Sequence, residues 1–168
     1  MKNQKSKKAF TMIELVFVVV IIGILATVAI PRLAATRDDA EITKGRTVLS
    51  SVRNALAMER QKRILRGEFD QITAIGDSTN VFGNFYTGAN GSRVDTGISI
   101  LEYPMPLPSS GSKKYKWNHS GDWYAFCLNN ACSGSADAVW FKVEKGKFVC
   151  KGDNDHTDNC SILGVTAE

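Results

Sequence analysis

The stretch Phe10–Ile30 most constrains this chain, because it is apolar throughout except for Glu14. As a helix that rises about 1.5 Å per residue it would be about 31 Å long. That length matches the roughly 30 Å hydrocarbon core of a bilayer. Lysines precede the stretch and Pro31 follows it. We therefore predict a single-pass membrane helix at 10–31, whose basic N-terminal end stays on the cytoplasmic side.

Two interpretations of this segment differ in where the chain is cut. A secretory signal has an apolar core of about 7–15 residues and a cut after small residues, which Thr27–Ala29 imitates. The run is long for such a signal, so we favour a retained anchor. A carboxylate in a membrane helix costs about 2.5–3.5 kcal/mol at the bilayer centre and less near an end. Glu14 therefore either meets a partner or reaches the headgroups, and the residues alone leave both interpretations open.

The positive charge of the chain belongs to its first nine residues. Their four lysines account for the whole formal net charge of +4, so residues 10–168 carry none. Composition therefore does not favour nucleic acid as a partner of the folded part. The lysines are at positions Lys2, Lys5, Lys7 and Lys8.

The helix is expected to continue past Pro31 to about residue 66 and to become amphipathic over 32–66. Pro31 removes an amide donor and should kink the helix. Positions 42, 45, 49, 52 and 56 have helical spacing, with Gly45 as a weak point, and should pack on the C-terminal domain. Gly67 is a suitable stop. The basic residues near the end are expected to form a solvated helix terminus, because no aromatic residues are interleaved for DNA binding. They are Arg60, Lys62, Arg63 and Arg66.

The remaining chain divides by composition. Residues 67–113 are rich in Gly, Ser, Asn and Thr, and we predict a connecting region with one or two short elements, which is the variable part in the family that the N-terminal motif resembles, as described below. Residues 114–168 are predicted to form an antiparallel β-sheet domain. Hairpin turns are expected at Ser120-Gly121 and Lys145-Gly146. The aromatic residues concentrated there are expected to form the core that covers the amphipathic helix. The predicted strands are 115–118, 122–128, 138–144 and 147–150.

The segment Lys7–Leu15, KKAFTMIEL, resembles the processing motif of type IV pilins and type II secretion pseudopilins. In that family a prepilin peptidase removes a basic leader and N-methylates the new first residue, usually Phe, and the fifth mature residue is Glu. The resemblance places the cut between Ala9 and Phe10, which makes Glu14 the fifth residue and 1–9 the leader. The family usually has Gly where this chain has Ala9. Pro31 falls where many pilins have a kinking proline.

The resemblance implies an α+β, pilin-like fold, with a long N-terminal helix packed on a C-terminal antiparallel sheet. It also implies self-assembly through the N-terminal helices, with Glu14 pairing with the freed amine of a neighbouring Phe10. In low dielectric such a charge-assisted pair is much stronger than at a surface. The implied partners are the prepilin peptidase, an inner-membrane assembly platform with its ATPase, and lipid before assembly.

All four cysteines fall in the last third of the chain, and an even number beyond a membrane segment favours disulfides over reduced thiols. Of the three possible connectivities we prefer the local one, Cys127 with Cys132 and Cys150 with Cys160, although Cys127 with Cys150 would also join two strands. A zinc site is disfavoured because neither pair has C-x2-C spacing.

The loop between the last two cysteines is a candidate calcium site. It contains Asp153, Asp155 and Asp158, and hard oxygen ligands at this density suit Ca²⁺. Major pseudopilins are known for calcium in their C-terminal loops, but a solvated acidic turn explains the same residues. No other cofactor is expected. Neither His119 nor His156 has an adjacent nucleophile pattern, so we do not predict an enzyme.

Three functions remain open. We favour a filament subunit, with a type II secretion pseudopilus preferred over a surface or DNA-uptake type IV pilus. It would lie in the bacterial inner membrane with its C-terminal domain in the periplasm before it enters the filament. The second is a membrane-anchored periplasmic binding module that does not polymerise. The third is a secreted protein cut near Ala29.

Overall fold

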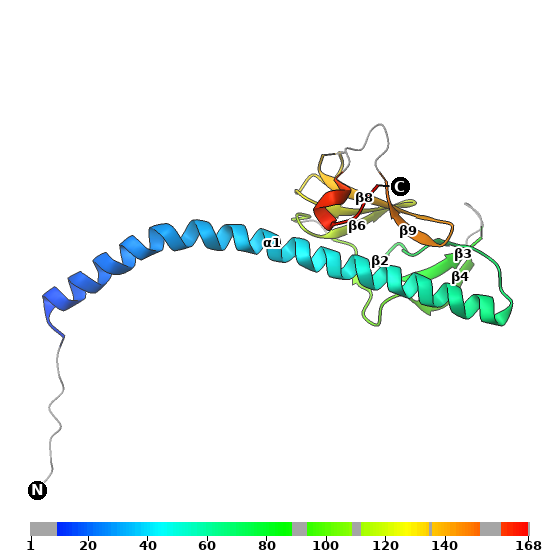
Figure 1. Cartoon of the computed structure of the whole chain (residues 1–168), viewed down its shortest axis with the longest axis horizontal. Coiled ribbons are helices and arrows are strands. Elements are labelled where there is room, and N and C mark those ends of the chain that lie inside the picture. Colours follow the sequence, from blue (N-terminus) through cyan, green and yellow to red (C-terminus); the bar gives the residue numbers. More distant parts are fainter. Residues whose placement is uncertain (1–9, 89–93, 109–111, 135, 152–158, 168) are drawn as a thin grey trace, which may run out of the picture. The chain divides into compact units, whose positions relative to one another are not determined.

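The computed structural model describes residues 10–88, 94–108, 112–134, 136–151 and 159–167. The chain divides into two compact units, Met1–Ala40 and Glu41–Glu168. One long helix, α1 (Met12–Arg66), contributes its first part to the first unit and its second part to the second. The nine strands described all follow it (Figure 1), so the α+β, pilin-like prediction is confirmed.

Helix α1 ends at Arg66, as the position of Gly67 predicted. This glycine has φ +76°, the left-handed conformation that ends many helices. Its N–H donates to the Ile64 carbonyl at 3.1 Å, and the Glu68 N–H donates to the Arg63 carbonyl at 2.9 Å. This pair of bonds is the Schellman arrangement, and it satisfies two carbonyls that the helix leaves open.

The C-terminal part of the second unit is a four-stranded antiparallel sheet in the order β6-β7-β8-β9, close to the predicted strands. Lys145 and Gly146 turn between β8 and β9 with φ of +50° and +72°, as a tight two-residue hairpin requires. Gly121, with φ +60°, lies in the turn between β6 and β7. The strands are β6 (Trp117–Ser120), β7 (Trp123–Cys127), β8 (Ala138–Glu144) and β9 (Lys147–Cys150), and a 3-10 helix, η1 (Cys160–Leu163), follows.

The region 67–113 was predicted to hold one or two short elements, and this was wrong. It contains five strands, arranged as a three-stranded sheet, β1-β3-β4, and a pair, β2-β5. Three of its apolar residues, Ile75, Val81 and Phe82, are fully buried in the main core. The strands form by antiparallel pairing between separated segments, which the polar composition does not reveal. They are β1 (Ile72–Ala74), β2 (Asn80–Phe82), β3 (Asn84–Thr87), β4 (Val94–Ser99) and β5 (Met105–Pro106).

The second part of α1 packs its apolar stripe into this core. Leu49, Val52 and Leu56 are at most 2% exposed and join the aromatic cluster of the sheets. Gly45 was expected to weaken the stripe, but it allows close packing. A Cβ at Gly45 would lie 2.7 Å from the Phe126 ring.

The stripe continues beyond residue 56 with charged residues. Glu59 and Arg63 are 3% and 4% exposed, and Arg63 Nε donates to Glu59 Oε1 at 3.0 Å. The prediction of a wholly solvated basic terminus is therefore wrong for Arg63. Helical spacing from Leu56 places both residues on the buried face, where an opposite charge must accompany each.

Two disulfides cross-link the second unit. Cys127 is bonded to Cys132 and Cys150 to Cys160, so the structure has the local pairing. All four sulfurs belong to residues that are at most 6% exposed.

Candidate functional site

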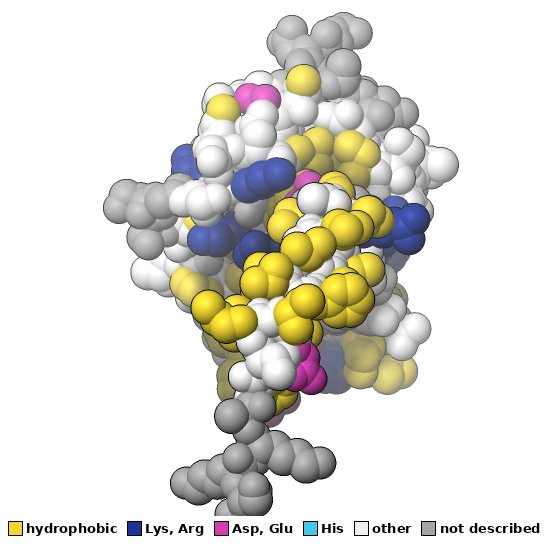
Figure 2. Space-filling model, turned by 90° about the vertical axis from the view of Figure 1, so that its left-hand side faces the viewer, with side chains coloured by type: hydrophobic (Ala, Val, Ile, Leu, Met, Phe, Trp, Pro, Cys, Tyr) yellow, Lys and Arg dark blue, Asp and Glu magenta, His cyan; other side chains and the backbone are white. Residues whose placement is uncertain are grey.

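The first unit presents an unusual amount of apolar side chain. From Phe10 to Leu33 the large hydrophobic residues are 40% to 85% exposed, and Figure 2 shows apolar side chains gathered on the helix. Within the described residues, α1 is the one helix long and apolar enough to cross a membrane, and no part of its most apolar window is buried. A soluble protein rarely leaves so large an apolar surface in water, so lipid or protein must cover it.

The carboxylate of Glu14 lies at the start of this apolar helix, in a capping box with Thr11. Glu14 N–H donates to Thr11 Oγ1 at 3.3 Å, and Thr11 Oγ1 and N–H donate to Glu14 Oε2 at 3.4 and 3.5 Å. The reciprocal bonds satisfy orphan donors of the first turn, and a negative charge at a helix N-terminus is favourable. Sequence reasoning missed Thr11, although Thr-x-x-Glu before an apolar run is the signature of this cap.

The geometry brings the predicted assembly residues into one turn of the chain. Phe10 is 81% exposed and directly precedes the Thr11–Glu14 cap. The long bonds in the cap leave the carboxylate able to accept stronger, charge-assisted bonds from another group. Ala9, the other residue of the expected cut, lies outside the described residues.

Pro31 lies inside α1, which continues through it. It cannot donate to the carbonyl four residues earlier. Hydroxyl groups nearby bond to other carbonyls of the helix: Thr27 Oγ1 to Ile24 O at 2.7 Å and Thr36 Oγ1 to Leu33 O at 3.0 Å. The kink at Pro31 stays a prediction.

In the second unit, the polar groups whose pKa values are shifted have structural roles. Burial alone would raise the pKa of Asp77, but hydrogen bonds from Thr79 and Asn80 lower it to about 2. The Glu68 pKa is lowered chiefly by its hydrogen bonds with Arg66, whose own pKa is raised by the same pair.

Metal and catalytic candidates find little support where the chain is described. No group of three His, Cys, Asp or Glu side chains there could hold a metal ion. The His119 ring packs against the Tyr124 ring at a tilt, with ring centroids 4.8 Å apart. The calcium candidates Asp153, Asp155 and Asp158 lie outside the described residues, as does His156.

Comparison with known proteins gives three findings. The prokaryotic N-terminal methylation motif matches residues 4–30. The type IV narrow pilus major component PilA5 of Thermus thermophilus is 33% identical over 85 residues, which cover 51% of this chain and 73% of that protein. The type II secretion system core protein G of Vibrio cholerae is 38% identical over 58 residues, covering 34% of this chain and 40% of that protein. No solved structure matches significantly.

Proposed function

Since the chain belongs to the family of type IV pilins and type II secretion pseudopilins, we propose that it is a filament subunit, and in particular a pseudopilin of a type II secretion system. The observation that carries this proposal is the exposed apolar part of α1, which begins with the capped carboxylate of Glu14. A helix of this kind is stable in lipid and equally in a bundle of identical helices. It can therefore pass from membrane to filament.

The proposed sequence of events begins in the bacterial inner membrane. The basic leader 1–9 stays cytoplasmic, and the second unit lies in the periplasm. A prepilin peptidase cuts between Ala9 and Phe10 and methylates the new N-terminus. The assembly platform and its ATPase then move the subunit from lipid into the filament.

Glu14 would select where each subunit docks. The cut creates an ammonium group at Phe10, and the Glu14 carboxylate of a neighbouring copy can accept its bonds in place of the long Thr11 contacts. An apolar residue at position 14 would leave that amine buried without a counter-charge, which is costly. The pair would also set the axial register between copies.

A subunit of a type IV pilus is the second candidate. The relative of which this chain covers 73% is a major pilus component, whereas the secretion protein is covered over 40% of its length. Deleting the gene distinguishes the two. Loss of exoprotein release with surface fibres retained supports the pseudopilus, and loss of surface fibres supports the pilus.

The N-terminus of the native protein and the assembly of a Glu14 variant test the filament role. Mass spectrometry of the native protein should find N-methyl-Phe10 as the first residue. Glu14→Leu should be processed but should lower the assembled fraction by about tenfold or more. Breaking a buried charge pair costs about 3–5 kcal/mol, and about 1.4 kcal/mol already corresponds to a tenfold change in an equilibrium constant. Electron microscopy and sedimentation of sheared filaments measure the assembled fraction.

Glu41→Leu is the matched control, because it removes a partly exposed carboxylate of the same helix outside the apolar part. An intact Met1 together with unchanged behaviour of Glu14→Leu would favour the anchored, non-polymerising module. A mature chain that starts at Ile30 would favour the secreted protein.

A further inference from the structure

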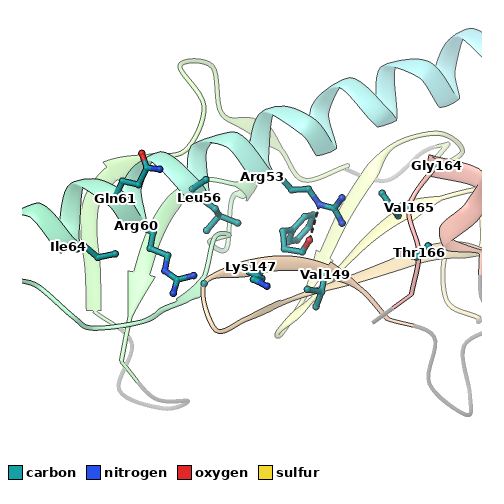
Figure 3. Close-up of a pocket in the computed structure, with 13 residues that line it drawn as sticks. Arg53, Leu56, Arg60, Gln61, Ile64, Lys147, Val149, Gly164, Val165 and Thr166 are labelled. Atoms are coloured by element: carbon teal, nitrogen blue, oxygen red, sulfur yellow. Dashed lines mark hydrogen bonds between the residues drawn. The ribbon is translucent and has the colours of Figure 1, made fainter.

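A groove in the second unit runs between α1, the β8–β9 hairpin and the C-terminal segment (Figure 3). Its volume is about 780 Å³. Residues between 53 and 64 of α1 form one wall, and residues 146–149 and 164–166 form the other. The space is within the range of pockets that bind ligands or short segments of chain.

The groove is positively charged. Arg53, Arg60 and Lys147 line it, and none of its lining residues is Asp or Glu. Arg60 comes from α1 and Lys147 from β9, so the cations lie on both walls (Figure 3). Residues 10–168 have no net formal charge, so this excess is local. Such a cleft concentrates carboxylates.

Apolar side chains with accessible surface also line the groove. Ile64 is 51% exposed, Ala57 is exposed and Val165 is half-buried. An occupant with apolar groups can therefore bury them here, while its charged groups reach the cations of the walls.

The groove also contains the edge of a sheet, because β9 is the last strand of its sheet. The register of the β8–β9 hairpin makes Lys147 and Val149 the residues whose backbone groups bond to β8. The N–H and C=O of Phe148, which lies between them, therefore point away from β8. Arg53 Nε donates to the Phe148 carbonyl at 3.0 Å, which agrees with this direction. The C-terminal segment meets the strand further along, at a bridge between Cys150 and Ala167.

We propose that this groove docks an extended acidic segment of a partner protein. Alternate side chains of an extended segment point to opposite sides, so apolar ones can contact Ile64 and Val165 while carboxylates meet Arg60 and Lys147. The Phe148 N–H, and the lone pair of its carbonyl that Arg53 does not use, can pair with the segment's own backbone, as in strand addition. The inference goes beyond the filament role and holds for either kind of filament.

Phosphate of a nucleic acid would also be attracted by the cations. The groove fits it less well, because its aromatic residue, Phe148, is buried and gives no surface for stacking bases. A strand edge beside accessible apolar side chains matches polypeptide.

The test uses the purified full chain in a non-ionic detergent and a fluorescein-labelled peptide of alternating Asp and Val. Fluorescence anisotropy should detect binding that weakens as salt is added. Arg60→Glu should weaken it about tenfold or more. Lys62→Glu, the same charge change at an exposed position outside the groove, should change it by less than about twofold. Ala57→Trp, which fills the groove without changing charge, should also abolish binding.

A peptide with N-methyl groups on its backbone should bind more weakly than its parent, because it has lost the donors that pair with the strand edge, and equal binding would remove strand addition from the proposal. Equal binding of an alternating Lys and Val peptide, or equal weakening by Arg60→Glu and Lys62→Glu, would overturn the proposal. Binding of single-stranded DNA without the acidic peptide would overturn it too, and would assign the cations to phosphate. Self-association lost in Arg60→Glu, with no peptide binding, would instead assign the groove to a second copy.

Discussion

Asp77 organises the turn between β1 and β2 through a single carboxylate. Its Oδ1 accepts bonds from the N–H and hydroxyl of Thr79, at 2.7 and 2.6 Å, and from the N–H of Asn80 at 2.6 Å. Desolvation opposes the charge, yet these bonds lower the pKa from 3.8 to about 2. Because the folded pKa is the lower one, the stabilisation is complete above about pH 4 and is lost as pH falls through about 2.

We predict that Asp77→Asn lowers the free energy of unfolding at neutral pH by about 2 kcal/mol. The variant should also lose the part of the acid sensitivity that falls between about pH 4 and 2. Urea unfolding of the full chain at several pH values measures both effects. Asp70→Asn, at an exposed carboxylate, is the control. Equal acid sensitivity of parent and Asp77→Asn would contradict the assignment.

Glu59 and Arg63 form a buried ion pair on the inner face of α1. Their side chains are 3% and 5% exposed, and Arg66 adds a longer contact of 3.6 Å to the same Glu59 oxygen. Arg63 Nη2 is buried and has no hydrogen-bond partner among the described residues. Removing one member therefore leaves an uncompensated charge, whereas replacing both with apolar residues removes the desolvation cost as well.

Glu59→Ala should lower the unfolding free energy by about 3 kcal/mol, and the double variant Glu59→Leu with Arg63→Met should recover most of it. The surface pair Lys44–Glu41 is the control, since Glu41→Ala should cost less than about 1 kcal/mol. Guanidinium unfolding of all four proteins gives the comparison. A double variant as unstable as Glu59→Ala would show that the pair itself is needed.

At the scale of elements, the second part of α1 packs closely on the sheet because Gly45 has no side chain. A Cβ there would lie 2.7 and 2.8 Å from two atoms of the Phe126 ring. Phe126 is 1% exposed and packs against Trp117, with ring centroids 5.4 Å apart, so the ring has little room to move. Glycine is a poor helix former, but at position 45 it lets the helix and the strand approach each other closely.

Gly45→Ala gains about 1 kcal/mol of helix propensity but overpacks the core at a cost of about 1–3 kcal/mol. We expect a net loss of about 1 kcal/mol, measured by tryptophan fluorescence during urea unfolding. All three tryptophans lie in β6, β7 and β8, so they report on this unit. Gly23→Ala, whose Cβ would meet nothing within 4 Å, is the control and should not destabilise. A Gly45→Ala variant more stable than the parent would contradict the packing argument.

At the scale of the molecule, the two units have different stabilising environments. Glu41–Glu168 has its own core and two disulfides, whereas the apolar part of α1 in Met1–Ala40 is exposed and needs lipid or protein to cover it. Ligands that bind the second unit can therefore stabilise it without acting on the helix. The proposed calcium loop, between Cys150 and Cys160, belongs to this unit.

If Asp153, Asp155 and Asp158 bind Ca²⁺, adding calcium at about 100 times its Kd should stabilise the second unit by about 2.7 kcal/mol. The thermal midpoint of the full chain should rise accordingly and fall again with EGTA. Replacing Asp153 and Asp155 by Asn should remove the response, and Mg²⁺ serves as the control ion. A midpoint that is unchanged by calcium and EGTA would contradict the calcium prediction.

The sequence by itself was enough for the features that depend on near neighbours. Apolar length, the Lys7–Leu15 motif and Gly67 predicted the long helix and its end, and β-branched and aromatic residues predicted the last four strands. These signals are local, because helix and hairpin geometry repeats over a few residues.

Only the tertiary structure decided the features that depend on distant segments meeting. The strands of 67–113 pair with one another in the orders β1-β3-β4 and β2-β5, which composition does not specify. The close approach of Gly45 to Phe126 requires the sheet to be in place. Arg63 is buried because sheets cover that face of α1, and the cationic groove joins residues from three separate segments. Burial and charge clustering are properties of the packed surface, so a linear pattern does not specify them.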